Sequence, residues 1–95
     1  MSYFYAIIET FQTTEEFSHN SIRARPLAGQ GLPTNMRVEC STAMRNNHPA
    51  GSKIKIRAQI KHTGSAPHLY TYFRWNYEVL TDEEVDRFIK DVDKK

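Results

Sequence analysis

The segment 53–61 constrains the fold most, because apolar and polar residues alternate along it without interruption. Its even-numbered positions are apolar, namely Ile54, Ile56, Ala58 and Ile60. Its odd-numbered positions are polar or charged, namely Lys53, Lys55, Arg57, Gln59 and Lys61. Successive side chains of a β-strand point to opposite faces of a sheet. The alternation therefore predicts a strand, which we extend to 53–63, with one buried face and one polar face.

Other segments complete the predicted sheet. Further strands are expected at 3–11, 21–25, 36–45 and 68–80. Apolar residues on both faces of the first of these are typical of a well-covered strand, and aromatic residues favour a strand in the last. Residues 26–35 contain Gly29, Gly31 and Pro33, which favour a loop because glycine and proline interrupt both regular patterns.

A helix is predicted at 82–93. Thr81 followed three residues later by Glu84 forms the capping-box pattern of a helix start. Apolar residues then recur at the spacing of one helix face, at Val85, Phe88, Ile89 and Val92. These elements predict a single α+β domain over residues 1–95. Its antiparallel sheet would have four to five strands, arranged as a meander or a half-open barrel, with the C-terminal helix packed on one face.

The net charge of +2 conceals an uneven distribution along the chain. Nine Lys or Arg residues lie between Phe17 and Tyr77, where Glu39 is the single acid. The last fourteen residues carry six acids against four bases. A surface of one sign attracts a partner of the opposite sign, so the central part of the chain favours an anionic partner.

A four-residue loop at 64–67 would join the strands 53–63 and 68–80 into a hairpin. The predicted pairs on its polar face are Lys61 with Tyr70, Gln59 with Tyr72, Arg57 with Arg74 and Lys55 with Asn76. The opposite face would place Phe73, Trp75 and Tyr77 in the core beneath the helix. On the polar face, cations would neutralise phosphates and tyrosines would stack on bases. The predicted nucleic-acid-binding residues are Lys53, Lys55, Arg57, Lys61, Arg74, Tyr70, Tyr72 and Arg37.

The function predicted from this face is non-enzymatic binding of single-stranded DNA or RNA. The alternative is a protein-interaction or self-assembling module, whose partner is a second copy of the chain or an acidic protein. A plainer interpretation also remains open, since lysine and arginine are ordinary solvent-facing residues of strands.

Catalytic, metal and membrane functions are not indicated by the sequence. Cys40 shares a predicted face with Met36 and Val38, which favours a small packed hydrophobe over a nucleophile. His62 and His68 should point to opposite faces, and no Cys or carboxylate spacing is typical of zinc. We therefore expect no enzyme, cofactor or metal. No stretch approaches the roughly 20 apolar residues of a membrane span, and no secretion signal is recognisable, so a cytoplasmic protein is expected.

Overall fold

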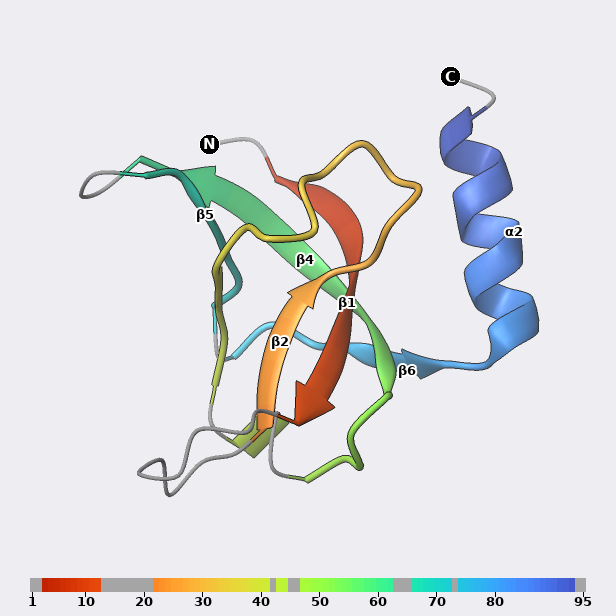
Figure 1. Ribbon diagram of the computed structural model, residues 1–95, viewed down its shortest axis with the longest axis horizontal. Helices are drawn as coiled ribbons and strands as arrows, with labels where there is room; N and C mark the ends of the chain where they lie inside the picture. Colours follow the sequence, from red (N-terminus) through yellow and green to blue (C-terminus); the bar gives the residue numbers. More distant parts are fainter. Residues whose placement is uncertain are drawn as a thin grey trace.

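The computed structural model describes residues 3–12, 22–41, 43–44, 47–62, 66–72 and 74–93. Its strands are β1 (Phe4–Gln12), β2 (Ile22–Pro26), β3 (Val38–Glu39), β4 (Lys53–Lys61), β5 (His68–Tyr70) and β6 (Glu78–Leu80), and its C-terminal helix is α2 (Asp82–Asp93). Within these residues the six strands form one mostly antiparallel sheet that curls into a nearly closed barrel, with α2 at its side (Figure 1). The predicted α+β fold is confirmed. Five residues of the predicted strands lie outside the described residues, namely Ser21, Thr42, Arg45, Thr63 and Phe73.

Strand β4 is the centre of the sheet, because β1, β5 and β6 all form hydrogen bonds to it. The sheet order is β2-β1-β4-β5-β3, and β6 pairs with β4 outside this path. Along one edge of β4, β1 runs antiparallel from the Phe4–Ala58 pair to the Glu9–Lys53 pair. Along the other edge, β5 pairs with the end of β4 and β6 with its beginning. Strand β4 therefore determines which side chains of its three neighbours share a face.

The barrel interior is packed with even-numbered side chains of β4. Ile54, Ile56 and Ala58 are at most 1% exposed. Buried residues from elsewhere in the chain complete this core, namely Ala6, Ile8, Met44 and Leu69. The alternation therefore predicted the buried face correctly. Ile60 is 39% exposed because it lies beyond Ala58, where the pairing of β4 with β1 ends.

The predicted strand 68–80 is two strands, and its predicted pairing with β4 is wrong. Lys61 pairs with His68 rather than Tyr70, so the connection between β4 and β5 is longer than the predicted four-residue loop. Lys53 pairs with Leu80. More residues therefore lie between His68 and Leu80 than between their partners Lys61 and Lys53 on β4. The additional described residues between β5 and β6 do not pair with β4, and we call this segment, 71–77, the excursion. Within it, Trp75 N–H donates to the carbonyl oxygen of Tyr72 at 3.0 Å.

The predicted strand 36–45 is also shorter than expected. Only Val38–Glu39 forms a strand within its described residues, and this strand runs parallel to β5, with Val38 opposite Leu69. The chain then turns helical at residues 43–44. Ser41 explains the change, because its hydroxyl accepts a hydrogen bond from Met44 N–H at 3.1 Å, as a helix-capping residue does.

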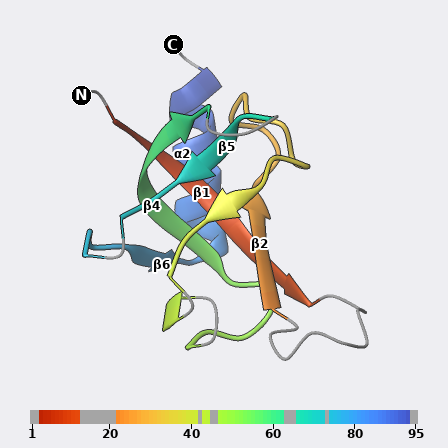
Figure 2. The same ribbon diagram turned by 90° about the vertical axis from the view of Figure 1, so that its left-hand side faces the viewer.

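Helix α2 lies outside the barrel, against the face that carries the odd-numbered side chains of β4. Thr81 N–H donates to Glu84 Oε1 at 3.0 Å, and Glu84 N–H donates to Thr81 Oγ1 at 3.3 Å, so the predicted capping box is confirmed. Val85 is buried, and the ring of Phe88 lies 5.8 Å from Lys55 Nζ. Figure 2 shows α2 behind β1 and β4, on the side away from β5.

Trp75 and Tyr77 do not pack beneath this helix, so the prediction is wrong for these two residues, whereas Phe73 lies outside the described residues. Trp75 is half-buried and its ring lies against Tyr72, with ring centroids 5.9 Å apart. Tyr77 is 36% exposed, and its hydroxyl lies 3.1 Å from Nε2 of His48. Trp75 and Tyr77 do not share the face that carries the isoleucines of β4, because neither residue pairs with β4.

The loop that follows β2 is attached to β1 by the side chain of Gln30. Ile7 N–H donates to Gln30 Oε1 at 2.9 Å, and Gln30 Nε2 donates to the carbonyl oxygens of Ile7 at 2.6 Å and Leu27 at 3.0 Å. The amide thus continues the ladder of β1 beyond the end of β2. The loop also contacts α2 at Gly29, which has a φ of 95° and where an added Cβ would lie 3.4 Å from Ile89.

Candidate nucleic-acid interface

Three outward-facing cations of β4, Lys55, Arg57 and Lys61, each lie over an aromatic ring. Lys55 Nζ is 5.0 Å from the ring centroid of Tyr5. Arg57 Cζ is 4.6 Å from the ring of Tyr3 and 5.6 Å from that of Trp75. Such contacts hold a cation against the negative face of the ring, and Lys61 repeats them, with Nζ 4.0 Å from the ring of Tyr70.

Strand pairing explains this arrangement. Tyr5 lies opposite Arg57 in the β1–β4 ladder, so odd-numbered residues of both strands point to the same face. Tyr3 precedes β1 with the same parity, and Trp75 reaches the face from the excursion. We call this surface the cation–aromatic face. It consists of Tyr3, Tyr5, Lys55, Arg57, Lys61, Tyr70, Tyr72 and Trp75.

Several rings of the cation–aromatic face are open to solvent. Tyr3 is 48% exposed, Tyr5 50% and Tyr72 37%. They form a connected group, because the ring centroids of Tyr3 and Tyr5 are 6.0 Å apart and those of Tyr3 and Trp75 are 6.2 Å apart. Aromatic rings that support one another edge to face offer their remaining faces to a flat ligand.

The cations of this face have aromatic rather than acidic neighbours. No carboxylate in the described part of the chain forms an ion pair with Lys55, Arg57 or Lys61. Glu78 is the cross-strand partner of Lys55, and it lies at the end of the face toward α2. The face is therefore bounded by acid at one end and carries cations and rings along the rest of β4.

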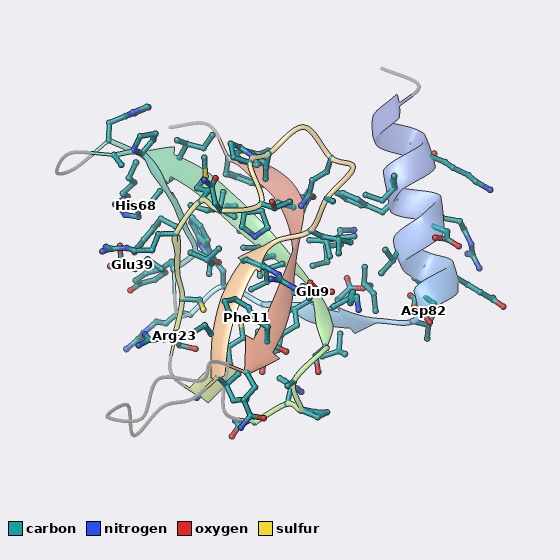
Figure 3. The ribbon with its side chains drawn as sticks, in the orientation of Figure 1. Glu9, Phe11, Arg23, Glu39, His68 and Asp82 are labelled. Atoms are coloured by element: carbon teal, nitrogen blue, oxygen red, sulfur yellow. The ribbon has the colours of Figure 1, made fainter. Side chains whose placement is uncertain are left out.

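Lys53 belongs to a separate network around Glu9 (Figure 3). Its Nζ lies 3.1 Å from Glu9 Oε2, and Arg25 Nη2 lies 3.0 Å from Glu9 Oε1. Burial acts to raise the pKa of Glu9, but hydrogen bonds from Lys53 and Arg25, together with their charges, outweigh it and hold this pKa below its ordinary value. Lys53 is thus engaged within the molecule.

The structure brings together five of the residues predicted for binding, namely Lys55, Arg57, Lys61, Tyr70 and Tyr72. Arg74 is exposed in the excursion, and the predicted pair of Arg57 with Arg74 is wrong because neither β5 nor β6 pairs with Arg57. Arg37 precedes β3 and lines a cleft with Arg23, which Figure 3 shows on the side of the molecule away from α2. The predicted set therefore divides between two sides of the barrel.

Tyr3, Tyr5 and Trp75 were not predicted as part of the interface. The sequence did indicate that Tyr3 and Tyr5 share a face of the first strand, because both positions are odd-numbered. It contained no signal that this strand would pair with β4. Trp75 was assigned to the core because its pattern matched a continuous strand.

Neither a candidate metal site nor a membrane-spanning helix is found in what the structure describes. No three His, Cys, Asp or Glu residues gather there in a group suited to a metal ion. His68 is 4% exposed, and its Nε2 lies 2.9 Å from Glu39 Oε2, which ties β5 to β3. No described helix has the length and apolar character needed to cross a membrane.

Known proteins provide no independent indication of function. The geometry and the charge of the cation–aromatic face are therefore the observations that indicate a function. Comparison of the chain with protein-family models, with curated protein sequences and with solved structures found no match.

Proposed function

We propose that the cation–aromatic face binds single-stranded nucleic acid and catalyses no reaction. The observation that carries the proposal is that Arg57 lies against the rings of both Tyr3 and Trp75, with Cζ at 4.6 and 5.6 Å from their centroids. A base stacks on an exposed ring while the adjacent cation contacts its phosphate, and each stacked base contributes about 1–3 kcal/mol. A duplex keeps its bases inside, so this surface favours a single strand.

The cations of the face predict a measurable salt dependence. Lys55, Arg57 and Lys61 lie on one face of β4, each beside an aromatic ring. If each neutralises one phosphate of a single strand, the logarithm of the affinity falls against the logarithm of salt concentration with a slope of about −2. Affinity should therefore decrease about twentyfold between about 50 mM and about 200 mM salt.

Fluorescence anisotropy with labelled oligothymidylate and oligouridylate tests the proposal at these two salt concentrations. The double variant Arg57→Gln and Lys61→Gln should lose most of the affinity and reduce the slope to roughly one third of its value, because one phosphate contact remains. Arg37→Gln is the matched control, since Arg37 is an exposed arginine away from this face. Circular dichroism establishes that each variant is folded.

Two outcomes would contradict the proposal. Unchanged binding by the folded double variant would exclude the cation–aromatic face as the interface. Equal competition by polyglutamate and by unlabelled oligonucleotide at matched charge would show that the rings contribute nothing. An acidic protein would then be the better candidate for the partner.

A further inference from the structure

One end of the cation–aromatic face meets helix α2. Lys55 Nζ lies 5.0 Å from the ring centroid of Tyr5 and 5.8 Å from that of Phe88, which α2 contributes. Beyond Tyr5 the row of rings continues through Tyr3 to Trp75, with neighbouring centroids 6.0 and 6.2 Å apart. Phe88 thus presents to Lys55 the same kind of flat ring that a base would present at this end of the row.

The helix that carries Phe88 is strongly acidic. It contains six Asp or Glu residues against two Lys or Arg. Asp91 follows Phe88 by three residues and Glu84 precedes it by four, so both lie on the same side of the helix as the ring. Both acids are exposed. Carboxylates around a ring have the charge pattern of phosphates around a base, so α2 offers the face the same groups as its proposed ligand.

Few side chains of α2 are buried against the barrel. Val85 is buried, Phe88 and Ile89 are half-buried, and the other side chains of α2 that the structure describes are exposed. A half-buried side chain gains less from leaving water than a buried one, because the gain scales with the apolar area removed from water. A helix of this length is marginal in water without packing, so α2 should melt where it loses these contacts.

We propose that α2 is an autoinhibitory element that competes with nucleic acid for the Lys55 end of the cation–aromatic face. The inference rests on the function proposed for that face. A bound strand places a base where Phe88 lies and a phosphate beside Lys55, and this phosphate repels the carboxylates of α2. The two occupants exclude each other, so a change that weakens the docking of α2 strengthens the binding of nucleic acid.

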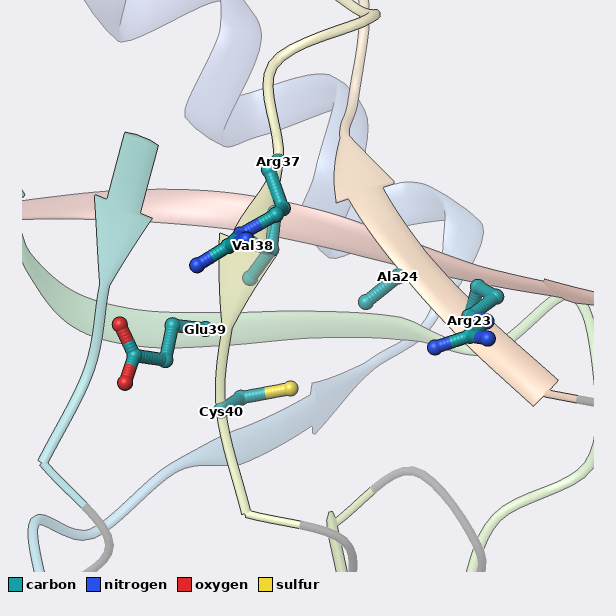
Figure 4. A pocket seen from close by; sticks show the side chains of 6 residues that line it. All are labelled: Arg23, Ala24, Arg37, Val38, Glu39 and Cys40. Atoms are coloured by element: carbon teal, nitrogen blue, oxygen red, sulfur yellow. The ribbon is translucent and has the colours of Figure 1, made fainter. Parts of the chain in front are cut away.

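Two arginines of the barrel lie away from this contact. Arg23 and Arg37 line a cleft between β2 and β3 (Figure 4), and Figure 3 shows Arg23 on the side of the molecule away from α2. A strand that bound at this cleft would not compete with the helix. The response of α2 to binding therefore distinguishes a strand on the cation–aromatic face from a strand held elsewhere.

Amide hydrogen exchange, followed by NMR on the full chain, tests the competition. The probe is oligothymidylate, added at about 50 mM salt until fluorescence anisotropy shows saturation. The amides of residues 85–91, which α2 protects by hydrogen bonds, should then exchange at least about tenfold faster. The amides of Ile54 and Ile56 in the core should keep their rates. Unchanged exchange in α2 at saturation would overturn the inference.

Variants of α2 provide a second measurement, in which damage to the helix should increase binding. Phe88→Ala should raise the affinity for oligothymidylate about threefold or more, because Lys55 loses its second ring. Asp91→Asn should raise it about twofold, and this gain should shrink at about 200 mM salt because salt screens exposed charges. Asp86→Asn is the matched control, since Asp86 precedes Phe88 by two residues and faces another side of the helix. It should change the affinity less than Asp91→Asn.

The outcomes separate this inference from the proposed function. Wild-type binding together with an affinity of Phe88→Ala that is no higher than that of wild type would overturn the inference alone. Absence of binding by both proteins would contradict the proposed function, and the inference with it. Binding by Phe88→Ala where wild type does not bind would support both.

Discussion

Replacing Gln30 by methionine should destabilise the protein by about 2–4 kcal/mol, because the loop after β2 loses its attachment to β1. Methionine keeps the unbranched shape of the side chain but can neither donate nor accept these hydrogen bonds. The Ile7 carbonyl oxygen still accepts from Leu27 N–H at 3.0 Å, whereas Ile7 N–H loses its partner at a residue that is 0% exposed. A buried donor without a partner costs about 1–3 kcal/mol. The two bonds donated by Gln30 Nε2 add about 0.5 kcal/mol each, the low end for a hydrogen bond, because Gln30 is only partly buried.

Urea denaturation followed by circular dichroism measures this difference, with thermal unfolding as a second readout. The melting temperature should fall by at least about 8 °C, since 1 kcal/mol corresponds to roughly 4–8 °C in a domain of this size. Gln12→Met is the matched control, because Gln12 is exposed at the end of β1. A loss below about 1 kcal/mol for Gln30→Met would refute the reasoning, because it would mean that Ile7 N–H finds another partner or is not buried.

The remaining predictions concern charge, capping and stacking. Glu9→Gln should cost about 1 kcal/mol at neutral pH. Because the pKa of Glu9 is lowered in the folded state, its contribution is complete above the unfolded pKa and disappears as pH falls through the folded value, so urea midpoints of the variant and wild type should converge in acid. Backbone and hydroxyl hydrogen bonds from Thr81 hold the pKa of Glu84 below its ordinary value. Thr81→Ala should therefore raise the pKa of Glu84 in an NMR titration. An unchanged pKa would exclude the contribution of the hydroxyl group. The double variant Tyr3→Leu and Tyr5→Leu should weaken oligonucleotide binding by about 1–3 kcal/mol for each stacked base that is lost. The dependence of the affinity on salt concentration should stay the same, because the cations remain. Unaltered affinity would argue against stacking.

Features determined by neighbouring residues could be predicted from the sequence. The two-residue alternation of 53–61 identified the buried face of β4, because strand geometry alone places alternate side chains on opposite faces. The pattern of Thr81 and Glu84 identified the start of α2, because its two hydrogen bonds join residues three apart in the chain.

Features determined by distant residues could not be predicted in the same way. The pattern of 68–80 is compatible with a continuous strand, and only the fixed pairs Lys61–His68 and Lys53–Leu80 require residues between them to leave the ladder. The direction of β3 was equally inaccessible, since alternation is the same in parallel and antiparallel strands. The first difference removed the predicted pairing of Arg74 with Arg57, and the second left Arg37 lining a cleft with Arg23.

The candidate interface was only partly visible in the sequence for the same reason. Lys55, Arg57 and Lys61 were predicted to share a face because they lie on one strand. Their neighbours Tyr3 and Tyr5 come from β1, and the sequence does not show which strands of a sheet are adjacent. Aromatic residues of one strand and cations of another become a single surface only through pairing of distant segments.

The central position of β4 also has a consequence for synthesis on the ribosome. Strands β1 and β2 emerge first and can pair with each other, but β1 ends at Gln12 and its second partner begins only at Lys53. Until then Ala6 and Ile8 remain uncovered, and one edge of β1 offers unpaired N–H and C=O groups to other chains. Fragments that stop before β4 should therefore aggregate or require chaperones, whereas chains that extend through α2 can bury this surface.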